Sequence, residues 1–204
     1  MPTRQILARE AALLEALPGR PFVRALAAGD VPRPALVRWL QEDLWFVRLL
    51  RRPVGLLLAD APDERAADVV AGAFPALDGE IRRFEAELAR LGAAPAPAPC
   101  ALVARFDRLL RDAAAAGFAT GIAAYWATEH AYLHAWSAVR GDGPARGPYA
   151  AWIENWTSPG FAAFVAGLGR LADEHADPAA ALPLAHEVLA LEVELWDHCW
   201  AAVG

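Results

Sequence analysis

The sequence predicts an all-α fold in a single domain that spans residues 1–204. Hydrophobic residues make up 56% of the chain and charged residues 22%. Ala and Leu dominate while β-branched residues are sparse, and this composition favours helices over strands. Apolar residues also recur at helical spacing along most of the chain. The length suffices for one hydrophobic core, and nothing in the sequence demands a second domain.

Gly and Pro residues mark most of the expected helix ends. Helices are expected over residues 6–17, from 21 onward, and over 34–58, 63–91, 101–116, 118–139, 149–156, 160–175 and 182–203. Pro53 and Pro75 fall inside two of these segments and are expected to bend or interrupt them. The stretch AAPAPAP at 93–99 is interpreted as an extended crossover within the single domain.

Charge and cysteine content exclude several classes of protein. The net charge is -6 with a pI near 5.4, and the arginines are scattered, which argues against a nucleic-acid partner. The first twenty residues lack the apolar run of a signal peptide, and no apolar run elsewhere is long enough for a bilayer. Cys100 and Cys199 lack CxxC spacing and are expected to be thiols. The sequence thus predicts a cytoplasmic protein.

Three predicted helices each place one acid on an apolar, aromatic-rich stripe, at about 100° per residue. The acids with their neighbours are Asp43 with Leu36, Trp39, Phe46 and Leu50; Glu129 with Tyr125, Tyr132 and Trp136; and Glu192 with Val188, Leu189, Leu195, Trp196 and Cys199. Burying an unpaired carboxylate is costly, so such groups have a function or a partner. The alternative is structural: each acid pairs with an arginine, such as Arg105 for Asp43, or lies at the edge of the buried face.

His130 and His134, spaced i and i+4 in the segment WATEHAYLHAW, suggest a metal site. They lie about a third of a turn from the stripe of Glu129, however, and a di-iron site draws acids and histidines from several facing helices. All five histidines fall at or after His130, so the first 129 residues offer no histidine ligand to haem or iron. We therefore predict no metal and no cofactor, and a packing or oligomer-contact role for the two histidines.

Five segments in register resemble the TenA family, whose helical bundle is shared with haem oxygenase and with the pyrroloquinoline quinone synthase PqqC. They are RPFVRAL at 20–26, WLQEDLWF at 39–46, EIRRFEAELARLG at 80–92, YAAWIENWTSPGF at 149–161 and LEVELWD at 191–197. The resemblance implies a haem-oxygenase-like helical bundle over nearly the whole chain.

Matched to the family residue by residue, Asp43 corresponds to the aspartate that bonds the aminopyrimidine ring, and Glu192 to the acid at the end of the bundle. Thr128 stands where many members carry a nucleophilic cysteine, and Glu129 beside it resembles the branch in which a glutamate replaces that thiol. Trp156 stands where many members have tyrosine, and Phe46 stands where the cysteine branch uses tyrosine. A further family tyrosine would fall near Arg105 or Phe106 and is missing here.

The resemblance implies hydrolysis of a thiamin-derived aminopyrimidine, or of its formylated form, in a salvage pathway. Asp43 would hold the amidine-like edge of the ring, while Glu129 and Glu192 share the proton transfers. The substrate-binding rings would be Phe46, Phe106, Tyr132 and Trp156. The family commonly forms homodimers or homotetramers, and the many tryptophans fit that expectation. Two alternatives remain open: a pyrimidine-binding or regulatory protein without turnover, and a metal-dependent oxidase on the same fold.

Overall fold

The computed structural model describes residues 1–141, 145 and 147–203, and the regular secondary structure in this part of the chain is helical, without strands. The helices are α1 (Pro2–Arg9), α2 (Ala11–Ala16), α3 (Pro21–Ala28), α4 (Arg33–Ala59), α5 (Glu64–Ala71), α6 (Ala73–Arg90), α7 (Ala101–Ala115), α8 (Phe118–Arg140), α9 (Ala150–Trp156), α10 (Pro159–His175), α11 (Pro178–Trp200) and the short 3-10 helix η1 (Ala201–Val203). The all-α prediction is confirmed.

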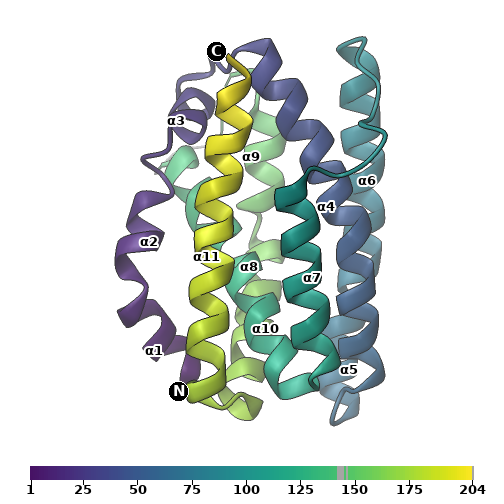
Figure 1. Ribbon diagram of the computed structural model, residues 1–204, viewed down its shortest axis with the longest axis vertical. Coiled ribbons are helices and arrows are strands. Elements are labelled where there is room, and N and C mark those ends of the chain that lie inside the picture. The colour runs from purple at the N-terminus through teal and green to yellow at the C-terminus, as the bar shows by residue number, and fades with distance from the viewer. Residues whose placement is uncertain (142–144, 146, 204) are drawn as a thin grey trace.

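Helix α8 runs through the middle of the bundle (Figure 1). It packs against α7, α9, α10 and α11, while α4 packs against α6 and α7. The eight consecutive residues from Gly121 to Thr128 are buried, so this part of α8 has no solvent face. A helix that is apolar all round is typical of a position enclosed by other helices. Side chains of α8 therefore lie where the neighbouring helices converge.

Two of the predicted helices are divided in the structure. The helix expected over 6–17 breaks at Glu10, whose buried carboxylate bonds to His186 Nδ1 at 2.8 Å. The helix expected over 63–91 breaks at Gly72, which leaves Pro75 in the first turn of α6. The first backbone N–H groups of a helix need no partner within it, so proline is tolerated there. Helix α4, in contrast, continues through Pro53.

The connector between α6 and α7 is fixed by side chains of α4. Gln41 donates a hydrogen bond to the carbonyl of Ala94 at 2.7 Å, and the indole N–H of Trp45 donates one to that of Ala96 at 2.9 Å. These bonds satisfy carbonyls that the extended, proline-rich segment cannot pair within itself. The connector thus lies against the helix that carries Asp43.

An aromatic cluster fills the core around Trp39. Its indole lies 5.3–6.1 Å, between ring centroids, from the rings of Phe22, Phe84, Trp136, Trp152 and Trp156. Six of the eight tryptophans are buried and the other two are half-buried. Most tryptophans therefore pack inside the protomer and, contrary to the sequence-based expectation, give no support for oligomer formation.

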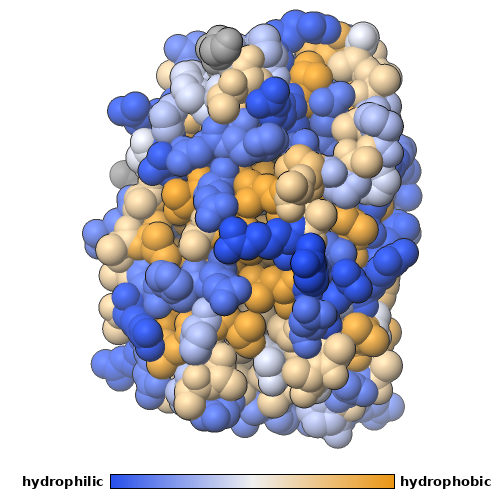
Figure 2. All heavy atoms as spheres, viewed as in Figure 1, coloured by the Kyte–Doolittle hydropathy of each residue, from blue (hydrophilic) through white to orange (hydrophobic). Residues whose placement is uncertain are grey.

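The surface is mostly polar. Figure 2 shows hydrophilic side chains over most of one face, with smaller apolar areas between them. Among the residues that the structure describes, the large hydrophobic side chains that are exposed are Met1 and Leu56. No helix within these residues combines the length and the apolar character needed to cross a membrane.

At Gly121, α8 lies close against Ala114 of α7 and Leu57 of α4. A Cβ atom added there would lie 2.7 Å from both Ala114 Cα and Leu57 Cδ2. We expect Gly121→Ala to lower the free energy of unfolding by about 1–3 kcal/mol, because backbone or core side chains must move apart. Urea unfolding measures this change. The control is Gly55→Ala in α4, where a Cβ meets nothing within 4 Å and stability should rise by about 0.5–1 kcal/mol; equal effects at the two sites would contradict the prediction.

Candidate active site

A small cavity of about 30 Å³ lies inside the bundle between α4, α6, α8 and α9. Its lining combines three acids, three aromatic rings and three smaller side chains. These residues are Asp43, Phe46, Val47, Leu50, Glu80, Thr128, Glu129, Tyr132 and Trp156. Five of the seven residues proposed from the sequence, namely Asp43, Phe46, Glu129, Tyr132 and Trp156, therefore meet at one place. The cavity has room for water but not for an aromatic ring, so a ring can enter only if side chains move.

Asp43 lies at the end of a chain of hydrogen bonds. The indole N–H of Trp39 donates to the Tyr132 hydroxyl at 3.3 Å, and that hydroxyl donates to Asp43 Oδ2. Burial raises the pKa of Asp43 from 3.8 to about 7, although the bond from Tyr132 lowers it in part. The alternative pairing with Arg105 does not occur, since Arg105 contacts Glu194 at 3.5 Å instead. Asp43 is thus held in one orientation by a neutral donor.

Glu129 is half-buried in the cavity wall and lies near a second acid. Burial and the charge of Glu80 raise its pKa from 4.5 to about 8, while the Tyr125 hydroxyl acts in the opposite direction. At neutral pH the Glu129 carboxyl is therefore mostly protonated. A carboxyl in that state can donate a proton to a leaving group.

Glu80 was missed in the sequence analysis. It accepts hydrogen bonds from Trp156 Nε1 at 2.8 Å and from Asn155 Nδ2 at 3.3 Å. Burial raises its pKa, whereas these two bonds and the charge of Arg83 lower it. Glu80 also lies on an apolar stripe at helical spacing, because it follows Leu77 by three residues and precedes Phe84 by four, and both of these residues are buried. The cavity therefore contains one more acid than expected.

Two of the proposed residues do not line the cavity. Phe106 is fully buried and packs on Phe46, with ring centroids 4.9 Å apart. Glu192 is also fully buried, and its Oε2 atom has no hydrogen-bond partner. Burial and the charges of Asp43 and Glu129 raise the pKa of Glu192 well above its usual range. Its protonated form is therefore favoured, and with Asp43, Glu80 and Glu129 it forms a four-carboxyl cluster.

The remaining residues of α8 have structural partners. Thr128 bonds back to the carbonyl of Ala124 at 3.1 Å. His130 stacks between Trp126 and His134, with centroid distances of 5.1 and 6.4 Å. Burial and the neighbouring His134 lower the pKa of His130 to about 4. The two histidines thus form a stacked row beside the cavity rather than part of it.

Two further spaces lie outside the cavity, along α6 and α10. A pocket of about 40 Å³ shares Glu80 and Glu129 with the inner cavity. An open cleft of about 330 Å³ shares Glu80, Phe161 and Phe164 with that pocket and adds Arg83, Asn155 and Ser158. The side chain of Glu80 borders all three spaces. Glu80 is therefore the residue that the three linings have in common.

Comparison with known proteins identifies the same bundle elsewhere. A sequence profile described as the TENA/THI-4/PQQC family matches residues 18–186. A solved TenA homologue from Pyrococcus furiosus superposes with a TM-score of 0.89 at 25% identity, covering 98% of this chain and all of that one. A TenA family transcription regulator from Silicibacter sp. TM1040 gives 0.88 at 18% identity, covering 98% and 96%. A candidate TenA-like thiaminase from Sulfolobus solfataricus gives 0.84 at 14% identity, covering 98% and 95%.

These superpositions confirm the single-domain, haem-oxygenase-like helical bundle that the resemblance implies. No curated protein sequence gives a significant match.

Proposed function

The chain belongs to the TENA/THI-4/PQQC family, and from this premise we propose that it hydrolyses a C–N bond of a thiamin-derived aminopyrimidine or its formylated form. One observation carries the proposal: a fixed aspartate, aromatic rings and a protonated glutamate line the same cavity. The name of the candidate thiaminase from Sulfolobus solfataricus is consistent with this substrate class. The further proposal that the chain belongs to the cysteine-free branch rests on Thr128 and Glu129.

Asp43 recognises the ring in this proposal. An aminopyrimidine presents an amino group beside a ring nitrogen, and a carboxyl group pairs with that edge through two hydrogen bonds. Tyr132 already donates to Oδ2 and so fixes the plane of the Asp43 carboxyl. Phe46 and Trp156 also line the cavity and supply faces for the ring. Phe106 supports Phe46 from behind rather than contacting the substrate.

Proton transfer is assigned to two acids whose pKa values are both raised by burial but whose other neighbours differ. Glu80 accepts bonds from Trp156 and Asn155 that favour its ionised form, whereas the charge of Glu80 favours the protonated form of Glu129. Glu129 then gives its proton to the departing amine as the C–N bond breaks. Glu80 accepts a proton from the water whose oxygen forms the new C–O bond. For the formylated substrate the same pair acts on the amide carbon, and formate is released.

The mechanism uses no thiol. No cysteine is among the residues that line the cavity. Thr128, at the position where the resemblance places the cysteine, donates its hydroxyl to the backbone of its own helix. Direct attack by water is therefore the proposed route. Glu192, which the sequence analysis paired with Glu129, remains in the proposal as a neutral carboxyl that adjoins Asp43 and Tyr132.

The test is release of ammonia from aminomethyl-pyrimidine and of formate from formylaminomethyl-pyrimidine, assayed without oxygen and without added metal ions. We expect turnover of at least one of the two, because hydrolysis needs only water. Ring binding without turnover would replace the hydrolase with a binding protein. Product formation that requires oxygen and iron would replace it with an oxidase, and neither binding nor turnover would overturn the proposal.

We also propose, from the family resemblance, that the protein is a cytoplasmic homodimer or homotetramer without a nucleic-acid partner. The net charge of -6 supports the last point. Light scattering coupled to size-exclusion chromatography measures the oligomeric state directly.

A further inference from the structure

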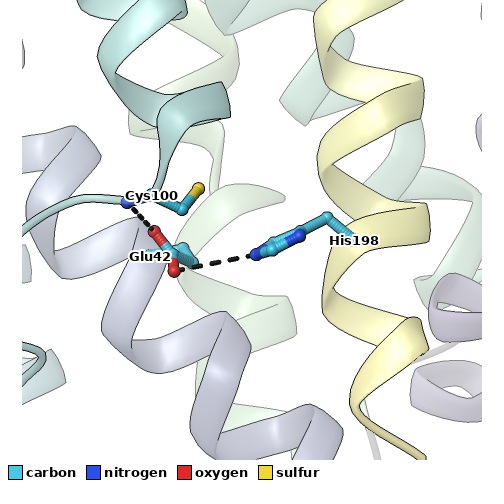
Figure 3. Close-up of side chains that lie close together, drawn as sticks. All are labelled: Glu42, Cys100 and His198. Carbon is cyan, nitrogen blue, oxygen red and sulfur yellow. Dashed lines mark hydrogen bonds and ion pairs between the residues drawn. The ribbon is translucent and has the colours of Figure 1, made fainter. Parts of the chain in front are cut away.

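Glu42, Cys100 and His198 form a second cluster of reactive side chains outside the cavity (Figure 3). They come from α4, from the residue that precedes α7, and from the last turn of α11. One ligand atom from each residue lies within 4.8 Å of the other two. Three helices that are distant in sequence thus present a carboxylate, a thiol and an imidazole to one point.

The distances suit ligands of a shared ion better than direct bonds. His198 Nε2 lies 3.7 Å from Glu42 Oε1, which is too long for a hydrogen bond. Two N or O ligands held at about 2.0 Å with tetrahedral angles lie about 3.3 Å apart, and a sulfur at about 2.3 Å lies about 3.6 Å from either. Small side-chain movements would therefore bring all three donors into contact with one ion.

Glu42 is held in the orientation that such a site needs. Its side chain is buried, and its Oε2 atom accepts a hydrogen bond from the backbone N–H of Cys100 at 3.1 Å. This bond directs the other oxygen toward His198 (Figure 3). An outer hydrogen bond that orients a ligand is typical of metal sites. The His198 side chain is 34% exposed, which leaves a path from solvent to the cluster.

A catalytic relay would need a different arrangement. In a Cys–His–acid triad the thiol and the acid bind opposite nitrogens of the imidazole. Here the nitrogen nearest to Glu42 is Nε2, and the thiol belongs to the same compact group of ligand atoms. Convergence on one point favours a cation over a proton relay.

We propose that Glu42, Cys100 and His198 bind one Zn²⁺ ion, with water in the fourth position. Zinc accepts sulfur, nitrogen and oxygen ligands together and favours four-coordinate tetrahedral geometry. The ion would join α4, α7 and α11 beside the segment of α4 that carries Asp43. Since the unfolded chain does not hold the three donors together, zinc would stabilise the folded state.

The test is zinc titration of metal-stripped protein by calorimetry, with Co²⁺ as a spectroscopic substitute. We expect one ion per chain and a thiolate-to-cobalt absorption band that shows Cys100 as a ligand. At free zinc 100-fold above Kd the melting temperature should rise by about 5–10 °C. Absence of binding, or a cobalt complex without the thiolate band, would overturn the proposal.

Three variants locate the site. Cys100→Ser and His198→Gln should each weaken zinc binding more than about 100-fold, because loss of even an outer partner costs about 10–100-fold. The matched control is His134→Gln, which removes one of the two stacked histidines of α8 and should leave zinc affinity unchanged. Binding that is lost in the control but kept in the other two variants would move the metal to His130 and His134 and overturn our assignment. Rapid Cys100 alkylation that zinc does not slow would indicate a free nucleophile instead.

Discussion

Glu129→Gln should reduce kcat by roughly 10²–10⁴-fold, the range that one general acid contributes. The amide keeps the size of the side chain and its hydrogen-bonding capacity but cannot supply a proton to the departing amine. Because Asp43 carries ring recognition, KM should change far less than kcat. Steady-state assays of ammonia and formate release measure both constants. A variant with wild-type kcat would exclude Glu129 as the acid.

Other acid-to-amide changes test which carboxyl groups besides Glu129 take part in catalysis. Glu80→Gln should also lower kcat, since Glu80 is the proposed base. The control is Glu187→Gln on the exposed side of α11, which should leave kcat and KM unchanged. If Glu192→Gln lowered kcat more than Glu80→Gln, Glu192 rather than Glu80 would be the catalytic partner of Glu129. Circular dichroism of each variant confirms that the bundle has folded.

The free energy of unfolding should decrease as the pH rises from 5 to 8. Folding raises the pKa of Glu129 from 4.5 to about 8, so between these values the folded protein holds a proton that the unfolded chain releases. The contribution of Glu129 to stability is complete below its unfolded-state pKa of 4.5 and is lost as the pH rises to its folded-state pKa of about 8. At pH 7 the loss amounts to about 3 kcal/mol. Urea unfolding across this pH range measures it.

Glu129→Gln should remove this part of the pH dependence and make the protein more stable at pH 7. The residue that we expect to be most important for turnover is then also one whose loss stabilises the fold. Glu187→Gln, at an exposed site, should keep the wild-type pH profile. Identical slopes for wild type and Glu129→Gln would mean that the Glu129 carboxyl titrates alike in the folded and unfolded states.

Sequence periodicity predicted much of the site because α4 and α8 each carry an acid on a stripe of apolar and aromatic residues. Asp43 and Glu129 were found as the acids on such stripes, and both line the cavity. Glu80 satisfies the same criterion on α6, between the buried residues Leu77 and Phe84, so the sequence also contains the signal for this acid. Periodicity says which face of a helix is buried, but not which buried faces meet. Phe106 and Glu192 are therefore buried as expected yet lie behind the cavity wall.

The helix breaks show a second limit of structure prediction from local sequence patterns. The break between α1 and α2 occurs at Glu10, whose partner His186 lies 176 residues further along the chain. Local propensity contains no information on a contact at that separation. Long-range side-chain bonds also fix the connector at 93–99, where the sequence predicted the extended chain but not the bonds from α4 to Ala94 and Ala96.

The packing of rings around Trp39 has an optical consequence. Indoles this close together couple electronically, so absorbed light is shared among them rather than confined to one ring. Trp156 belongs to this group, 4.8 Å from Trp136 and 5.4 Å from Trp152 between ring centroids, and also borders the inner cavity. A ring that entered the cavity would therefore perturb the whole coupled set. Intrinsic fluorescence and near-ultraviolet circular dichroism thus report on occupancy of the cavity without an attached label.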